Sequence, residues 1–209
     1  MSRMRSRAWT AAVVVVSVAL VACGGGGRSA SSPAASSGTT LPVDVRTETF
    51  VDTSRATAAQ PDQAAAPSRT LETAIYVPGG SAPRSAAGRP LILFVHGSGG
   101  NPDFYRVLLE GWAAQGYVVA APRFPSDLEN QPGDVSFVLS ELLRLSSMAT
   151  GPYAGGIDGN RIGVAGHSAG GVTVLGVAFN ACCLDRRIRA GVVQAVTAEV
   201  SFKLDVVEA

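Results

Sequence analysis

The sequence predicts an α/β domain built on a doubly wound, mostly parallel sheet. Four short apolar runs are typical of strands buried on both faces of such a sheet: residues 91–95, 117–121, 161–165 and 188–193. Three segments with helical character separate or follow these runs: residues 103–115, 135–148 and 169–179. Strands and helices that alternate through short connections favour this architecture.

Length and composition limit the number of domains and point to a distinct N-terminal segment. The chain has 209 residues, enough for one domain with a real core. Apolar residues make up 46% of it and charged residues only 16%. Part of the apolar excess lies at the N-terminus, where Arg3, Arg5 and Arg7 precede an apolar run over residues 11–22. A basic start followed by such a run is typical of a secretion signal, and the run is shorter than the roughly 20 residues that a membrane span needs.

The apolar run ends in Leu20-Val21-Ala22-Cys23, followed by four glycines. This segment resembles the lipobox of bacterial lipoproteins. The resemblance implies that residues 1–22 are cleaved and that Cys23 carries a diacylglycerol, which holds the protein on the outer side of the cytoplasmic membrane. The alternative is an ordinary cleaved signal with an incidental cysteine and a secreted product. Loss of three arginines and no acid changes the net charge from +1 to −2 without leaving a basic run, so nucleic acid is not expected as a partner.

Residues 23–40 are mostly Gly, Ser, Ala, Thr and Pro, a composition that predicts a flexible tether. The domain is therefore expected over residues 41–209. Its opening segments, 43–51 and 70–77, alternate in polarity and predict an antiparallel pair of strands.

The helical segments carry more detailed expectations. Apolar residues follow a helical period through the first of them: Phe104, Val107, Leu108, Leu109 and Trp112. Asp134, after Pro132 and Gly133, is expected to cap the second helix. Asp158-Gly-Asn160 predicts a turn, and the loop over residues 124–132 is expected to line the mouth of a cleft.

Gly166-His-Ser168-Ala-Gly170 fits the pattern G-x-S-x-G between a buried strand and a helix that opens at Ala169. A nucleophile elbow requires this context, because its serine sits in a strained turn whose flanking residues must be small. The helix N-terminus behind Ser168 adds partial positive charge where an oxyanion would develop. Ser168 is therefore predicted as a catalytic nucleophile. The alternative is a structural glycine-rich turn.

His96-Gly-Ser98-Gly-Gly100 follows the strand at residues 91–95. In folds with such an elbow, one oxyanion donor comes from the loop after this strand and the other from the residue after the nucleophile. The backbone N–H groups of Ser98 and Ala169 are the predicted donors. Taken alone, the segment is equally compatible with a tight strand-to-helix turn.

Three segments together carry a resemblance to the α/β-hydrolase family: residues 95–100, 116–122 and 161–171. The sequence is most similar to its dienelactone-hydrolase-like and platelet-activating-factor-acetylhydrolase-like branch, which includes secreted polyester hydrolases. The resemblance implies Ser168 as nucleophile, Ser98 and Ala169 as oxyanion donors, and small-molecule or polymeric carboxylic esters or thioesters as substrates. No cofactor or metal is expected, since the motifs contain neither a phosphate-binding nor a metal-ligand constellation.

The acid and the base of a triad are not identifiable in the sequence. In this family they follow the nucleophile in the order Asp or Glu, then His. The two histidines, His96 and His167, belong to the motifs above: His96 is expected to hold its loop by hydrogen bonds, and His167 to point away from the Ser168 hydroxyl. Six acidic residues are weak candidates for the triad acid, and those in loops are expected to have structural roles: Asp127, Asp158, Asp185, Glu199, Asp205 and Glu208.

These gaps suggest a truncated or frameshifted form of a longer hydrolase, or one piece of a split protein. The last apolar strand is then expected at a sheet edge that could pair with another chain. Two hypotheses follow. The first is a lipid-anchored serine esterase with little turnover as written, with thioesterase, peptidase and perhydrolase chemistry as variants. The second is a non-catalytic surface lipoprotein that uses the fold as a binding or structural module.

Cys182 and Cys183 are adjacent. They are compatible with a strained disulfide, with pairing to another cysteine, or with buried thiols, and we favour a buried or structural role over a metal site.

Overall fold

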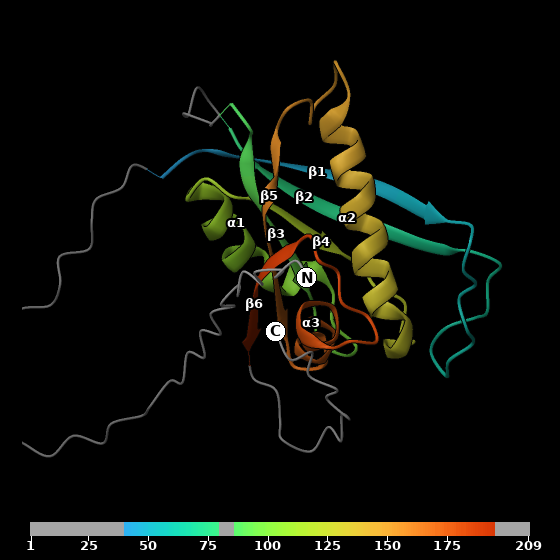
Figure 1. The fold of residues 1–209 in the computed structure, drawn as a ribbon. Helices are drawn as coiled ribbons and strands as arrows, with labels where there is room; N and C mark the ends of the chain where they lie inside the picture. The colour runs from blue at the N-terminus through green and yellow to red at the C-terminus, as the bar shows by residue number, and fades with distance from the viewer. Residues whose placement is uncertain (1–39, 80–85, 195–209) are drawn as a thin grey trace, which may run out of the picture.

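The computed structural model describes residues 40–79 and 86–194. Within them six strands form one sheet in the order β1-β2-β4-β3-β5-β6 (Figure 1). The predicted signal, Cys23, the tether up to residue 39 and the acidic residues Glu199, Asp205 and Glu208 lie outside the described residues.

The sheet opens with the antiparallel pair predicted from the alternating segments, β1 (Val43–Asp52) and β2 (Arg69–Pro78). β2 runs antiparallel to β4 (Val118–Pro122). From there the sheet is parallel, through β3 (Arg89–Val95), β5 (Ile157–His167) and β6 (Ile188–Gln194). The fold is an α/β-hydrolase fold: a mixed, doubly wound sheet with antiparallel opening strands, as the sequence predicted.

Helices cover both faces of the sheet. α1 (Arg106–Ala114), preceded by the 3-10 turn η1 (Pro102–Tyr105), packs on one face against β2 and β4. α2 (Gln131–Ser147), preceded by η2 (Leu128–Asn130), and α3 (Ala169–Phe179) pack on each other and on β5. Two separate apolar clusters result, one on each face. Burial on both faces explains why the parallel strands read as continuous apolar runs.

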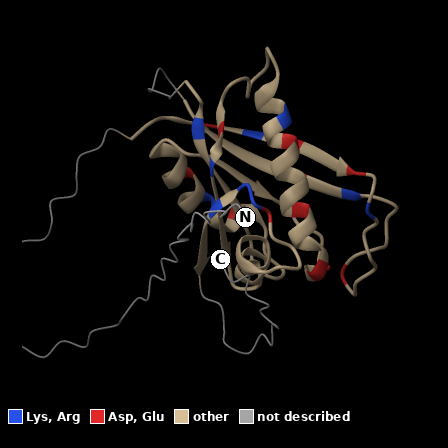
Figure 2. Cartoon of the chain, viewed as in Figure 1, with Lys and Arg blue, Asp and Glu red and all other residues tan. Residues whose placement is uncertain are grey.

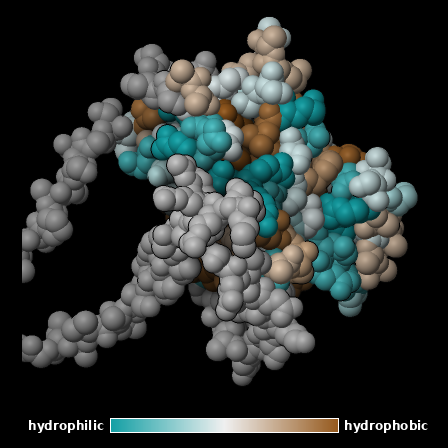
Figure 3. All heavy atoms as spheres, viewed as in Figure 1, coloured by the Kyte–Doolittle hydropathy of each residue, from teal (hydrophilic) through white to brown (hydrophobic). Residues whose placement is uncertain are grey.

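The surface outside these clusters is mixed. Segments of positive and negative charge lie close together on β1, β2 and α2 (Figure 2). The face over α2 likewise shows hydrophobic and hydrophilic patches side by side (Figure 3). No helix among the described residues has the length and apolarity needed to cross a membrane.

Two local predictions were wrong. α2 begins at Gln131, with Pro132 in its first turn, so Asp134 lies inside the helix, where it pairs with Arg69 instead of capping. Asp158 and its two neighbours belong to β5 rather than to a turn, because β5 extends back to pair with Arg89. In the first helical segment the apolar residues Phe104 and Val107 are 72% and 87% exposed, so these two do not face the core.

Candidate active site

A sharp turn centred on Ser168, here called the elbow turn (residues 166–170), joins β5 to α3. Ser168 has φ 51° and ψ −122°, and among the described residues it is the one non-glycine residue with positive φ. Such a conformation costs about 1–3 kcal/mol and persists only where its surroundings enforce it. The Ser168 N–H donates to the Gln194 carbonyl at 2.9 Å, and the Gly171 N–H donates to the Ser168 carbonyl at 2.9 Å. The strained turn predicted from the sequence is present.

Two glycines make the elbow turn sterically feasible. A Cβ atom on Gly166 would collide with the Gly170 carbonyl oxygen, and one on Gly170 would collide with the carbonyl oxygens of Val95 and His96. Backbone atoms cannot move aside as the end of a long side chain can. The elbow turn therefore packs directly against the end of β3, which places it beside the loop that follows β3.

That loop, the 96–100 loop, lies against Ser168. A Cβ atom on Gly97 would be 3.2 Å from the Cβ of Ser168. The loop is closed by a 3.0 Å hydrogen bond from the Gly100 N–H to the Gly97 carbonyl. Ser98 and Ala169, the two predicted donors, both line a cavity of about 230 Å³ at this place, which we call the elbow cavity.

Other segments line the rest of the elbow cavity, away from the 96–100 loop and Ala169. Its further lining residues are Asp62 and residues between β4 and the first residue of α2: Phe124, Pro125, Ser126, Leu128 and Gln131. The prediction that residues 124–132 line a cleft is confirmed. Phe124 is nevertheless buried, and its ring packs on His96 with 5.5 Å between the ring centroids.

His96 holds the 96–100 loop to this segment. Its Nε2 accepts the Phe124 N–H at 3.1 Å, so its Nδ1 carries the proton and donates to the Gly97 carbonyl at 2.8 Å. Burial lowers the pKa of His96, the hydrogen bond to Gly97 opposes this, and Arg123 adds to the lowering. His96 is thus a neutral structural bridge, with both ring nitrogens occupied, as predicted.

His167, the residue before Ser168 in the elbow turn, is held by Tyr105. The Tyr105 hydroxyl lies 2.9 Å from its Nδ1 and 3.4 Å from the Gly97 N–H. The Gly97 N–H donates to the Tyr105 hydroxyl, which also shares a hydrogen bond with Nδ1 of His167. None of the hydrogen bonds of the described residues joins the Ser168 hydroxyl to a histidine or a carboxylate.

The described acidic candidates are engaged elsewhere. Asp185 forms an ion pair of 2.5 Å with Arg187 in the loop after α3, and Asp158 accepts the Asn160 N–H at 3.0 Å. Asp127 forms two hydrogen bonds with Arg69, at 2.7 and 2.9 Å. All three are structural, as predicted.

Sequence analysis did not find the buried charge cluster to which Asp127 belongs. Arg69 on β2 is fully buried and binds Asp127 and Asp134 through two hydrogen bonds each. Arg55 adds an ion pair of 2.9 Å to Asp134. Asp127 and Asp134 lie 58 and 65 residues from Arg69 along the chain, beyond the range of any local pattern. The cluster ties β2 to the segment that lines the elbow cavity.

Burial raises the pKa of the Asp127 and Asp134 carboxyl groups, whereas their hydrogen bonds and ion pairs lower it. Burial raises the pKa of Asp127, but hydrogen bonds from Arg69 and Asn130 outweigh it and the pKa is lowered overall. Asp134 is more deeply enclosed, and there burial prevails over Arg69 and Arg55, so that its pKa is raised. The cluster is stable only as a unit, because removal of the guanidinium of Arg69 would leave two carboxylates buried without their main partner.

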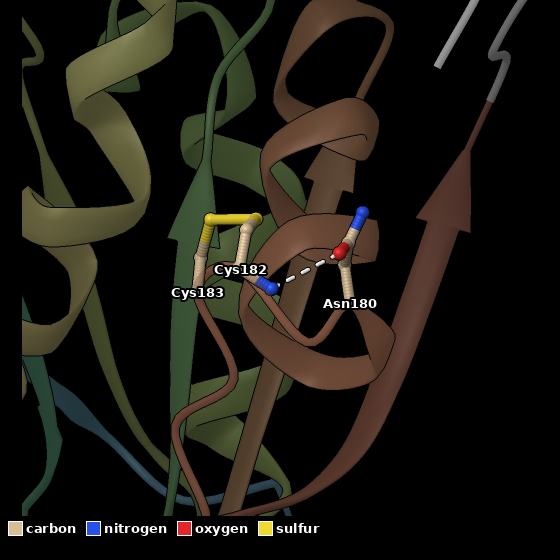
Figure 4. Close-up of a disulfide and its surroundings, with 3 residues drawn as sticks. All are labelled: Asn180, Cys182 and Cys183. Carbon is tan, nitrogen blue, oxygen red and sulfur yellow. Dashed lines mark hydrogen bonds between the residues drawn. A yellow bond between two sulfur atoms is a disulfide. The ribbon is translucent and has the colours of Figure 1, made fainter. Parts of the chain in front are cut away.

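Cys182 and Cys183 form a disulfide with each other, directly after α3 (Figure 4). Of the alternatives that the sequence left open, the disulfide between neighbours is the observed one. Nothing in the spacing could decide this, because adjacent cysteines are compatible with each of them. Cys182 is exposed and Cys183 half-buried.

A sequence model of the chlorophyllase family matches residues 56–193, about two thirds of the chain and all the elements described above except β1. The chain belongs to the chlorophyllase family. The predicted relationship to esterase-type α/β-hydrolases is thereby confirmed. No curated protein matches the sequence significantly.

Solved structures resemble this member of the chlorophyllase family in fold. A hypothetical protein from Pseudomonas aeruginosa has a TM-score of 0.53 and 18% identity, over 75% of this chain and 44% of its own. A ferulic acid esterase from Streptomyces cinnamoneus has a TM-score of 0.48 and 23% identity, over 76% of this chain and 59% of its own. The chlorophyllase-family chain thus spans less than two thirds of the length of either protein.

The site of this chlorophyllase-family chain contains a strained serine, a glycine-rich loop against it, and a small cavity lined by that loop and by Ala169. Among residues 40–79 and 86–194 no group of three His, Cys, Asp or Glu side chains is placed to hold a metal ion.

Proposed function

We propose that the chain is a serine hydrolase of carboxylic esters or thioesters, and that Ser168 is its nucleophile. The observation that carries the proposal is the backbone of Ser168, held at φ 51° between a buried strand and a helix N-terminus. A protein retains such strain where an exposed reactive hydroxyl is needed. Membership of the chlorophyllase family supports ester substrates.

The reaction proceeds by acyl transfer. Ser168 Oγ forms a bond to the carbonyl carbon and loses its proton to a base. The carbonyl oxygen, now an anion, is stabilised by the backbone N–H groups of Ser98 and Ala169 and by the N-terminus of α3. The bond to the alcohol or thiol then breaks, the leaving group takes up a proton, and water releases the acyl group from Ser168.

Neither histidine supports the role of the base. Both nitrogens of His96 bind the protein backbone, and Nδ1 of His167 binds Tyr105. An alcohol without a base near its hydroxyl is a weak nucleophile. The 209-residue chain by itself is therefore expected to react with strong electrophiles but to turn over esters slowly.

A fluorophosphonate probe tests this proposal, because it is a strong electrophile that bonds to the nucleophilic serine and needs no turnover. Wild type and Ser147→Ala, which changes an exposed serine on α2, should be labelled, and Ser168→Ala should not. Labelling retained in Ser168→Ala would remove this serine from the proposal. Failure of the folded wild-type chain to react would favour a non-catalytic surface lipoprotein that uses the fold as a binding module.

We further propose that residues 1–22 are a signal peptide and that Cys23 carries lipid, which anchors the protein at the outer side of the cytoplasmic membrane. The support is the order of basic residues, apolar run and Leu-Val-Ala-Cys in the sequence. In a bacterial host fed with labelled palmitate, wild type and Cys182→Ser should incorporate the label, and Cys23→Ser should not. Incorporation into Cys23→Ser would contradict the proposal.

A further inference from the structure

A cavity of about 640 Å³ lies beside α1, and it shares no lining residue with the elbow cavity. Its walls come from Trp112 on α1, from residues 90–92 on β3 and 160–165 on β5, and from β6. We call it the α1–β6 cavity. Residues 90–92 lie at the amino end of β3, whereas the 96–100 loop of the elbow cavity follows its carboxyl end. The reaction proposed above therefore does not use this space.

The α1–β6 cavity presents apolar surface to solvent. Tyr117 and Val192 in its wall are 38% and 37% exposed. The space over Gly163 is open, because an added Cβ atom there would meet only backbone oxygens, at 3.7 Å or more. Helix α1 packs mainly over β1, β2 and β4, so it does not cover β5 and β6. An exposed apolar recess of this size, beside the last strand of the described sheet, is typical of a contact site.

Two arginines bring positive charge to this apolar wall. Arg161 on β5 and Arg189 on β6 line the cavity, and both are exposed. Neither side chain forms a hydrogen bond or an ion pair with another described residue, and no Asp or Glu lines the cavity. Guanidinium groups attract phosphate and can bind it through two parallel hydrogen bonds. The α1–β6 cavity thus combines an apolar wall with two cations that have no acidic partner among the described residues.

Two aromatic residues add a third property. The half-buried Trp112 packs on Phe94, with 6.0 Å between the ring centroids, and Tyr117 directly precedes β4. Trp and Tyr gather where the apolar interior of a membrane meets its headgroups, because one end of the ring is apolar and the other forms hydrogen bonds. A polypeptide would fit the apolar wall without needing the arginines. An anionic lipid would use the apolar wall, the aromatic rings and the arginines together.

The chain enters the domain beside this cavity. The Leu41 N–H donates to the Ala114 carbonyl at 3.0 Å, so the segment ahead of β1 meets α1 two residues after Trp112 (Figure 1). Residues 24–40 separate Leu41 from Cys23, the proposed point of lipid attachment. Such a stretch spans at most about 60 Å when fully extended, so it would keep the domain near the bilayer. The α1–β6 cavity therefore lies on the side of the domain from which the proposed anchor leads to the membrane.

We propose that the α1–β6 cavity is a docking surface for anionic phospholipid of the membrane. Arg161 and Arg189 bind lipid phosphates, and the apolar wall lies against the upper part of the acyl chains. The inference rests on the proposed lipid anchor at Cys23 and adds the orientation of the domain. Because the elbow cavity adjoins the opposite end of β3, it then lies away from the bilayer.

Trp112 reports on the docked state. The sequence contains two tryptophans, Trp9 and Trp112, so Trp9→Phe leaves Trp112 as the single tryptophan whether or not the signal is removed. The full chain carrying Trp9→Phe is produced in a bacterial host and placed on vesicles of brominated phosphatidylglycerol or brominated phosphatidylcholine. Bromine on an acyl chain quenches tryptophan emission only at near contact. We expect at least twofold stronger quenching on phosphatidylglycerol, a difference that about 1 M salt should remove.

Two double variants test the role of the arginines. Arg161→Gln combined with Arg189→Gln should lower the quenching on phosphatidylglycerol to the level seen on phosphatidylcholine. Arg46→Gln combined with Arg144→Gln removes the same charge from β1 and α2 and should leave the quenching unchanged. All four side chains are exposed, so neither double variant is expected to unfold the protein.

Flotation with phosphatidylcholine vesicles separates docking from anchoring. Flotation that Cys23→Ser abolishes reports the lipid anchor, whereas quenching of Trp112 reports the docking. A chain that does not float with phosphatidylcholine would overturn the proposed anchor, and its quenching on phosphatidylglycerol would still decide the docking. Equal quenching on the two lipids, or equal quenching of the two double variants on phosphatidylglycerol, would overturn the inference and leave the apolar wall to a polypeptide partner.

Discussion

The Tyr105 hydroxyl lies 2.9 Å from Nδ1 of His167 and joins the two segments that enclose Ser168. It also accepts the Gly97 N–H at 3.4 Å, so one oxygen atom links the 96–100 loop to the elbow turn. The Tyr105 ring is positioned by Phe94, with 4.6 Å between the ring centroids. The spacing between the two proposed oxyanion donors, Ser98 and Ala169, thus depends on a residue that belongs to neither motif.

Tyr105→Phe should therefore loosen the site while leaving the fold intact. The variant loses the bond to His167 and the weaker one from Gly97, and should be destabilised by about 1 kcal/mol in urea unfolding. Its rate of labelling by a fluorophosphonate should fall several-fold, because the donors are less well placed. Tyr117→Phe, which changes a partly exposed tyrosine, is the control and should match wild type in both measurements. Equal labelling rates for all three proteins would contradict the linking role of Tyr105.

Gly170→Ala should be far more disruptive than its small size suggests. The added methyl group would meet the carbonyl oxygens of Val95 and His96, so β3 and α3 would have to separate. We expect a loss of about 3 kcal/mol or more in the free energy of unfolding, the upper end of the range for overpacked sites. Gly176→Ala in the same helix is the control and should stabilise the protein by up to about 1 kcal/mol. A Gly170→Ala protein as stable as wild type would show that the elbow turn is not packed as described.

The junction of β5 and α3 shows what a sequence pattern can predict. Helix α3 begins at Ala169 and ends at Phe179, as predicted, because the buried strand, the small residues and the serine act within a few positions of one another. The prediction for Asp134 failed for the opposite reason. Its position near the start of a helix favoured capping, whereas its partner is Arg69, on a strand 65 residues earlier.

The same distinction holds within the site. The hydrogen bonds of His96 were predicted because they follow from its place at the end of a buried strand. Tyr105 and His167 are 62 residues apart in the sequence. No local sequence pattern links residues at that separation, so their contact could not be predicted. The state of Cys182 and Cys183 depends on the redox environment and on the backbone after α3, neither of which can be read from adjacency alone.

Arg69→Met should destabilise the protein strongly, because it leaves Asp127 and Asp134 buried without their main partner. A loss of about 3–5 kcal/mol in the free energy of unfolding is expected for a broken buried pair. Arg106→Met is the control, since Arg106 pairs with Glu110 on the exposed side of α1 and its loss should not be measurable. Chemical unfolding of the two variants beside wild type gives the comparison. Similar stability of Arg69→Met and Arg106→Met would mean that the buried cluster adds little to folding.

His96 should make the stability of the protein depend on pH in a defined direction. Its pKa in the folded state lies below its ordinary value of 6.5, because burial disfavours the charged ring. The unfolded chain therefore binds a proton more readily, so the contribution of His96 is fully present above pH 6.5 and is lost as the pH falls through 6.5 towards the lower folded-state value. His96→Gln does not titrate there. The difference in unfolding free energy between wild type and His96→Gln, measured in urea at about pH 7.5 and about pH 5.5, should shrink at the lower pH. A difference that stays constant or grows on acidification would contradict a neutral, buried His96 and would require a charged ring between Gly97 and Phe124.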